Sequence, residues 1–524
     1  MTAPTRAGAP GPGAVLALLG VLVAATCLLP LGYVVVSSAQ LGPGEAMDFL
    51  VRPRVGRLLW NTTRLLLGGV TLSVVLGVAC AWLVVRTNLP GRHLWHGLLA
   101  APLAVPAFVN GWGWVSTTHG VRSFWGAVLV VSLSYYPLVY LPTVAALRRL
   151  DSGLEDVAAS LGHRSVATFL RVVLPAISPA VLGGALLVGL HLLGEYGALQ
   201  ILNYPTLTTG ILDQYRTSFN GPAATLLALV LVAFCLLLLA LELLARGQRR
   251  RSRVGSGVNR LATRTRLGSS AAPVVLGLTG LAVLSLGVPL ASLARWLVRG
   301  TSTAFPVGEL TSATFTTLGL AVAGGLVATV AALPVAWLAV RHRGVLATAI
   351  ERSVYPANAL PGIVVALALV TVSIRSVPAL YQTIPLLVLG YSILFLPRAV
   401  VSVRGTLELA PPVLDDVARS LGCTDVEAAR RVTLPLILPG LGASLALVSL
   451  AVSTELTATL LLSPIGTNTL ATRFWQQAYS VQYGAAAPYA VLLILLSVPA
   501  TWLLSRAANR DGLRAPVRPL GAVT

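Results

Sequence analysis

The chain has 524 residues, of which 56% are hydrophobic and only 10% are charged. Because about a quarter of the residues in a soluble domain are charged, this composition excludes a soluble globular enzyme. All 37 basic residues are arginine, which also excludes chemistry that needs a lysine amine, including the phosphate-binding lysine of a Walker A loop. The net charge of +20 does not indicate nucleic-acid binding, because most arginines lie in short segments between apolar runs.

Apolar runs recur along the whole chain, and each is long enough to cross about 30 Å of hydrocarbon as a helix. They predict an all-α polytopic membrane protein with about twelve transmembrane helices. The first six spans are expected near 13–38, 62–85, 96–116, 124–146, 179–202 and 223–245. The second six are expected near 272–298, 312–340, 354–374, 383–403, 436–462 and 487–505.

The arginine distribution predicts the orientation of these spans and the domain boundaries. Arginines concentrate on one side of the predicted membrane, which the positive-inside rule assigns to the cytoplasm. The densest group falls in a Gly- and Ser-containing stretch midway along the chain. We therefore expect 246–271 to be a cytoplasmic linker between a first half, 13–245, and a second half, 272–505. The tails 1–12 and 506–524 are expected to be cytoplasmic as well.

The first apolar run has two interpretations. Arg6 precedes it, and Ser37, Ser38 and Ala39 resemble a signal-peptide cleavage site. However, the run is longer than the 7 to 15 apolar residues that are usual in a signal peptide. We therefore expect a retained transmembrane helix.

The two halves share an internal repeat. Residues 154–180 align without a gap on 414–440, and 14 of these 27 positions are identical. Upstream, at a slightly smaller offset, Pro106, Tyr136 and Pro142 of the first half meet Pro361, Tyr391 and Pro397 of the second. Six spans separate the copies, so both have the same orientation, and the sequence predicts two parallel six-helix repeats.

Each copy of the repeat lies in a polar helical segment between the fourth and fifth spans of its half, at 151–178 and 411–438. Its acids stand in a first helical turn, where they complement the helix dipole, its alanines allow close approach, and its glycine ends the turn. A Leu-Pro pair is expected to start the next helix. An ordinary surface helix would explain one copy, but two copies with one spacing favour docking of a cytoplasmic partner. The expected docking residues are Glu155, Asp156, Ala158, Ala159, Gly162, Leu174 and Pro175, and in the second half Asp415, Asp416, Ala418, Gly422, Leu434 and Pro435.

This pattern, acid-Asp-Val-Ala-x-Ser-Leu-Gly followed by Leu-Pro twelve residues after the glycine, resembles the EAA loop of ABC importer permeases. The opening Glu-Ala-Ala of that loop is degenerate here, and Arg419 stands where a small residue is usual. The resemblance implies two separate ATPase subunits on the cytoplasmic side, which bind ATP and Mg themselves, so that no cofactor belongs to this chain. It also implies an extracytoplasmic substrate-binding protein, a place in the cell membrane and no nucleic-acid partner.

A second resemblance concerns the substrate. The segment 454–462 with the later 469–473, and in the first half 194–198, are similar to iron(III) transporter permeases that depend on a ferric-binding protein. This resemblance implies an iron(III) path. Phosphonate, thiamine and other permeases share much of this plan and stay open as alternatives. An ion-gradient-driven secondary transporter is a further alternative, which the two docking segments oppose.

Glu195 and Glu455 occupy equivalent positions of the repeat within the predicted fifth and eleventh spans. Carboxylates at such depth usually face a bundle interior or a water-filled path, and an acidic pair suits a ferric ion or a cationic complex. With Tyr196 and Thr457, they are the candidate translocation path. The alternative is that each glutamate is a structural hydrogen-bond acceptor. His191 lies one turn before Glu195, but its equivalent in the second half is an alanine, so no metal site is assigned.

Overall fold

A computed structural model of the chain describes residues 13–150, 153–162, 165–217, 220–246, 265–300, 302–342 and 344–510. These residues are helical apart from their connections and one isolated bridge between Thr87 and Thr265. Nine helices are long and apolar enough to cross a membrane, and three bent helix pairs raise the candidate spans in the described residues to twelve. The prediction of an all-α polytopic membrane protein is confirmed. The expected N-terminal tail, most of the linker and most of the C-terminal tail lie outside the described residues.

From α3 and α16 onward the two halves follow the same order of elements, except in the fourth span. The first contains α1 (Ala14–Ala39), α2 (Pro43–Leu50), α3 (Pro53–Arg86), α4 (Arg92–Ala100), η1 (Ala101–Ala104), α5 (Ala107–Thr117), η2 (His119–Val121), α6 (Phe124–Tyr135), α7 (Pro137–Arg149), α8 (Gly153–Ser160), α9 (Ser165–Thr168), η3 (Phe169–Val173), α10 (Leu174–Gly194), α11 (Gly197–Ile201), α12 (Leu207–Arg216) and α13 (Gly221–Arg246). The second contains η4 (Gly268–Ser270), α14 (Ala271–Ala282), η5 (Val283–Gly287), α15 (Val288–Arg299), α16 (Val307–Arg341), α17 (Val345–Val354), η6 (Tyr355–Ala359), α18 (Gly362–Ser376), η7 (Pro378–Leu380), α19 (Ile384–Leu409), α20 (Pro412–Ser420), α21 (Asp425–Ala428), η8 (Ala429–Thr433), α22 (Leu434–Ser453), α23 (Thr457–Leu462), α24 (Leu470–Tyr479) and α25 (Tyr483–Arg510).

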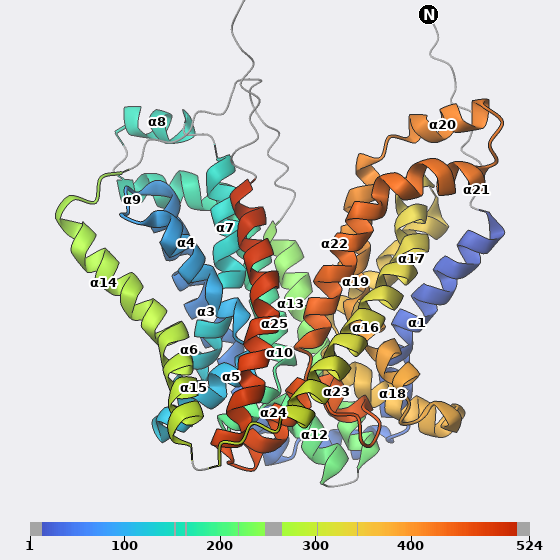
Figure 1. Ribbon diagram of the computed structural model, residues 1–524, viewed down its shortest axis with the longest axis horizontal. Helices are drawn as coiled ribbons and strands as arrows, with labels where there is room; N and C mark the ends of the chain where they lie inside the picture. Colours follow the sequence, from blue (N-terminus) through green and yellow to red (C-terminus); the bar gives the residue numbers. More distant parts are fainter. Residues whose placement is uncertain are drawn as a thin grey trace, which may run out of the picture. The chain divides into compact units, whose positions relative to one another are not determined.

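The helices form two compact units that interleave along the chain. Unit 1 combines Met1–Leu58, Leu207–Leu236 and Ser302–Leu493. Its centre is the trio α16, α19 and α22, which run side by side in Figure 1. Helix α1, from the start of the chain, packs against α16, α17 and α18 of this unit. The approach is close at Gly20, where an added Cβ would lie 2.6 Å from Leu338 Cδ1.

Unit 2 combines Leu59–Thr206, Leu237–Thr301 and Ile494–Thr524. Within it, α7 packs against α10, and α15 packs against α5. Gly113 of α5 is so close to α15 that an added Cβ would lie 2.8 Å from Pro289 Cα. The first span of each half therefore packs against helices of the other half, an exchange that hydrophobic patterns do not predict.

Three predicted spans are sharply bent. The pair Arg92–Ala104 and Ala107–Thr117 meets at 91°, and the pair Val345–Ala357 and Gly362–Ser376 meets at 105°. Pro106 and Pro361 lie at these bends and precede the second helix of each pair. A proline lacks an amide N–H and restricts the residue before it to extended backbone, so it ends one helix and starts the next.

The fourth span differs between the halves. In the first half it is bent by 43° between Phe124–Tyr135 and Pro137–Arg149. In the second half it is the single helix α19. Pro137 begins α7, whereas the repeat-related position in α19 is Ser392, so a proline accounts for the bend in one half only.

The Leu-Pro pairs begin α10 and α22, as predicted, but no break in the chain precedes them. Leu174 and Leu434 follow the π-helical turns η3 and η8 directly, and the chain stays helical through both. A π turn is wider than an α turn, so it accommodates Pro175 and Pro435 where a regular helix would bring the ring against an earlier carbonyl. The equivalent placement of two such rare turns is structural evidence for the repeat.

The fifth and eleventh spans are also shorter than predicted. Helix α10 ends at Gly194 and helix α22 at Ser453, and the short helices α11 and α23 follow after a break. The prediction that Glu195 and Glu455 lie inside continuous spans is therefore wrong. Apolar composition could not show these breaks, because the residues on both sides of each are equally hydrophobic.

Candidate functional site

The expected docking segments form short helices outside the long spans. Figure 1 shows α20 and α21 beyond the start of α22 in unit 1, and α8 beside α9 in unit 2. Ala158 of α8 and Ala418 of α20 are buried within their units, so the small residues let each short helix pack closely on its own unit. The side chains of Asp156 and Ala159 lie outside the part of the chain that the structure describes.

An ion pair fixes each docking helix to the end of a long helix. In unit 2, Arg86 Nη2 lies 2.8 Å from Glu155 Oε1, and these side chains are 5% and 21% exposed. In unit 1, Arg341 Nη2 lies 3.4 Å from Asp415 Oδ2, with side chains 10% and 16% exposed. Each arginine is the last residue of its helix, α3 or α16, where a cation also complements the helix dipole.

These arginines were not among the predicted site residues. A signal for them exists in the sequence, because Arg86 and Arg341 are related by the same offset that relates Pro106 to Pro361. The second ion pair has additional contacts: Thr433 Oγ1 donates a hydrogen bond to Asp415, and Arg341 donates to the carbonyl of Ala410 at 3.0 Å. The repeat-related neighbour in the first half is Val173, which has no polar side chain.

The two glycines of the repeat adopt left-handed backbone. Gly162 has φ +84° and Gly422 has φ +91°. An added Cβ would meet no atom within 4 Å at either position. Backbone conformation, and not space, therefore requires glycine at these turns.

The outer face of α20 is apolar although it faces solvent in unit 1. Val413, Leu414, Val417 and Leu421 recur at helical spacing and are all exposed, and Val426 of α21 is exposed nearby. Asp416 and Arg419, which form an ion pair, flank this face. An apolar surface with a polar border is typical of a protein interaction site. Leu434 and Pro435 are exposed at the start of α22, and Leu174 and Pro175 are half-buried at the start of α10.

The two path glutamates cap the short helices that follow the breaks. Glu195 Oε1 accepts the N–H of Ala198 at 2.8 Å, and Glu455 Oε1 accepts the N–H of Ala458 at 2.8 Å. A carboxylate satisfies an otherwise unpaired donor at such a helix start and complements its dipole. Both glutamates thus have a local structural role.

The surroundings of the two glutamates differ. Tyr135 of α6 donates its hydroxyl to Glu195 Oε2, and the Tyr135 ring lies 5.3 Å from the ring of His191. In the second half, Gly390 and Ala451 stand at the positions equivalent to Tyr135 and His191. There, Arg398 of α19 interacts electrostatically with the Glu455 carboxylate. Gly362 also approaches Glu455, because an added Cβ would lie 3.1 Å from Oε1.

The other two path candidates lie beside these glutamates. Tyr196 is buried in unit 2, and Thr457 is the first residue of α23 and half-buried in unit 1.

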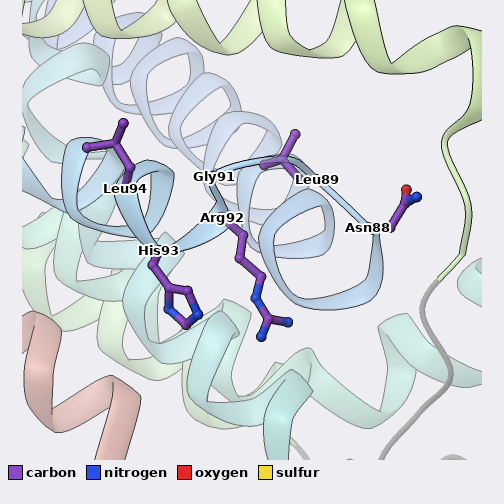
Figure 2. Close-up of a pocket in the computed structure, with 6 residues that line it drawn as sticks. All are labelled: Asn88, Leu89, Gly91, Arg92, His93 and Leu94. Carbon is purple, nitrogen blue, oxygen red and sulfur yellow. The ribbon is translucent and has the colours of Figure 1, made fainter.

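Other parts of the described chain offer no cation site of the usual composition. No three His, Cys, Asp or Glu side chains among the described residues are close enough to hold a metal ion. An open depression of ≈ 390 Å³ lies at the turn between α3 and α4 (Figure 2), where Arg92 and His93 extend to one side. Its lining is Asn88, Leu89, Gly91, Arg92, His93 and Leu94. Because it contains no carboxylate, it does not suit a cation.

Comparisons with known proteins agree with this architecture. The sequence profile of the family described as binding-protein-dependent transport system inner membrane component matches twice, at residues 73–251 and 324–510. The chain is 39% identical, over 94% of its length and 98% of the relative's, to the Fe(3+)-transport system permease protein FbpB 2 of Haemophilus influenzae. It is 30% identical to the sulfate transport system permease protein CysW of Escherichia coli, over 41% of this chain and 82% of CysW.

Proposed function

The chain belongs to the family of inner membrane components of binding-protein-dependent transport systems, and we propose that it is the complete permease of an ATP-driven importer for iron(III). It carries two copies of the family domain, so one chain supplies both halves of the membrane component. The observation that carries the proposal is the docking segment, which occurs once in each half. A mostly buried ion pair joins each copy to the end of a long helix.

Two ATPase subunits dock at α8 and α20 on the cytoplasmic side. The exposed apolar face of α20 supports this assignment, because solvent exposure of Val413, Val417 and Leu421 is unfavourable until a partner covers them. ATP and Mg bind to these partners, and the chain itself hydrolyses no ATP, since it has no lysine for a Walker A loop.

Iron(III) is the proposed substrate, and a soluble binding protein delivers it to the extracytoplasmic side. The high identity with a ferric permease over nearly the whole chain supports iron. Glu195, at the helix break of the first half, supports a cation over an oxyanion such as sulfate, because a carboxylate repels an anion in a weakly polar surrounding.

Reconstitution in proteoliposomes tests this function. The permease is assembled with an ATPase subunit and a ferric-binding protein from the same organism, and uptake of radioactive iron and ATP hydrolysis are measured together. We expect the ferric-loaded binding protein to stimulate hydrolysis and drive uptake. Stimulation by sulfate, phosphonate or thiamine with no response to iron would contradict the substrate. Iron uptake that follows an ion gradient without ATP would contradict the class of transporter.

The orientation has its own test. Reporter fusions in the linker at 246–270 and after residue 505 are expected to report the cytoplasm, because arginine density sets the orientation. A periplasmic signal at either point would contradict the twelve-span arrangement with both termini in the cytoplasm.

A further inference from the structure

The negative charges of the two repeat-related glutamates, Glu195 and Glu455, have different electrostatic surroundings. Glu455 has Arg398 within electrostatic range, so its charge is compensated inside unit 1. Among the residues that the structure describes, no arginine forms an ion pair with Glu195. The first-half position equivalent to Arg398 is Thr143. A carboxylate without a compensating cation is expensive in a membrane region and marks a functional site by default.

The tyrosine and histidine beside Glu195 are not needed for its capping role. Glu455 makes the same bond to the N–H three residues ahead, although Gly390 and Ala451 stand at the positions of Tyr135 and His191. The second half therefore serves as an internal control. Tyr135 and His191 are therefore not required for the cap at the break.

His191 is held in the form that can bind a metal. Its Nδ1 lies 2.8 Å from the carbonyl oxygen of Leu187. A carbonyl only accepts hydrogen bonds, so Nδ1 carries the proton and the lone pair lies on Nε2. Fixing the tautomer through a backbone carbonyl is the usual way in which proteins orient a histidine ligand.

We propose that Tyr135, Glu195 and His191 form a transient binding site for the ferric ion on its way through the permease, and that Glu455 is a structural cap. This inference rests on the proposed function and specifies which residues contact the cargo. Carboxylate and phenolate oxygens suit a small, highly charged cation, and an imidazole nitrogen is acceptable to iron. All three side chains are partly exposed in unit 2.

Binding changes protonation but not oxidation state. The Fe³⁺–O bond to Tyr135 forms as the phenolic O–H bond breaks, and the proton leaves to water. Iron remains ferric throughout. Because the hydroxyl hydrogen of Tyr135 now points to Glu195, its departure also leaves a carboxylate oxygen next to the ion.

The test uses the full-length permease in lipid nanodiscs, titrated with ferric nitrilotriacetate. Ferric phenolates absorb visible light, so the wild type is expected to develop a charge-transfer band. Tyr135→Phe should abolish the band, and Glu195→Gln should weaken binding by at least about tenfold. The Gln side chain still accepts the N–H of Ala198, so the variant removes charge and keeps the cap.

Two matched variants in the second half serve as controls. Glu455→Gln keeps the equivalent cap, and Tyr391→Phe removes a hydroxyl that lies 2.7 Å from Thr459 Oγ1 and not against a carboxylate. Both should leave the band and the iron affinity unchanged. Absence of the band in the wild type, or its persistence in Tyr135→Phe, would overturn the inference.

Uptake measurements separate this inference from the proposed function. In proteoliposomes, Tyr135→Phe and Glu195→Gln should lower iron uptake per molecule, whereas Glu455→Gln should not. If Tyr135→Phe is unstable, His191→Gln is the substitute, because it keeps the bond between Tyr135 and Glu195 and should still weaken iron binding. Normal uptake in all first-half variants would refute the binding site and leave the importer intact. A wild type that transports another substrate and no iron would refute the proposed function itself.

Discussion

In the first half, an arginine at the end of α3 holds the docking helix through Glu155, whereas in the second half Asp415 contacts both Arg341 and Thr433. The pairs occupy the same place in the repeat and use the same chemistry, but the second has a hydrogen bond that Val173 cannot supply in the first. The two halves thus share the ion pair between docking helix and long helix, but they differ in the hydrogen bonds around it.

The helix breaks diverged further than the docking segments. Both keep the glutamate cap, yet the side chain that interacts with the glutamate is Arg398 in the second half and Tyr135 in the first. The ion pair of the docking segments is thus kept in both halves, whereas the surroundings of the two glutamates are not.

The largest expected effect concerns the glycines that end the docking turns. Replacing both Gly162 and Gly422 by Val forces a β-branched residue into left-handed backbone, at about 1–3 kcal/mol per site. The double variant should reach the membrane and lose nearly all stimulated ATP hydrolysis. The two single variants should each lower stimulated hydrolysis less than the double variant does.

A matched control is Gly442→Val in α22, where an added Cβ meets no atom and the backbone is helical. It should retain stimulated hydrolysis. Full stimulated activity in the double glycine variant would remove α8 and α20 from the coupling mechanism.

A smaller effect is expected when an ion pair is broken. Arg86→Gln leaves Glu155 mostly buried without its cation and should destabilise unit 2 by about 3 kcal/mol. Arg341→Gln should likewise destabilise unit 1, although Thr433 still donates to Asp415. Melting temperatures of the purified variants measure the difference.

The control for both arginine variants is Arg54→Gln, which breaks an ion pair whose side chains are 54% and 46% exposed. An exposed pair contributes under about 1 kcal/mol, so this change should be nearly silent. Melting temperatures of the Arg86 and Arg341 variants equal to that of Arg54→Gln would show that neither ion pair stabilises its unit.

The smallest expected effect comes from a substitution that makes the surroundings of the second ion pair resemble those of the first. Thr433→Val removes one hydrogen bond and should lower stability by about 1 kcal/mol. Combined with Arg341→Gln, it should be more damaging than the sum of the two single changes, since Asp415 then loses both partners. Strict additivity of the three melting temperatures would contradict this shared role.

The spans and the repeat could be predicted from the sequence, because each is encoded by a pattern of neighbouring residues. The twelve spans are visible as apolar runs, and the repeat is visible because fourteen of 27 residues are identical. The ion pair of Arg86 could not be predicted from local patterns, because its partner Glu155 lies in a helix 69 residues further along the chain. A comparison of all arginines at the repeat offset identifies Arg86 and Arg341 as equivalent residues.

The sequence by itself determined that this chain is a duplicated membrane protein with a matching polar helical segment in each half, because hydrophobic length, arginine distribution and repeat identity are properties of neighbouring residues. Only the tertiary structure decided that the first span of each half packs against the other half, and that Glu195 and Glu455 cap short helices at breaks. It also decided that Tyr135 meets Glu195. These features depend on packing between distant helices and on hydrogen bonds across breaks, which leave no periodic signal in the chain.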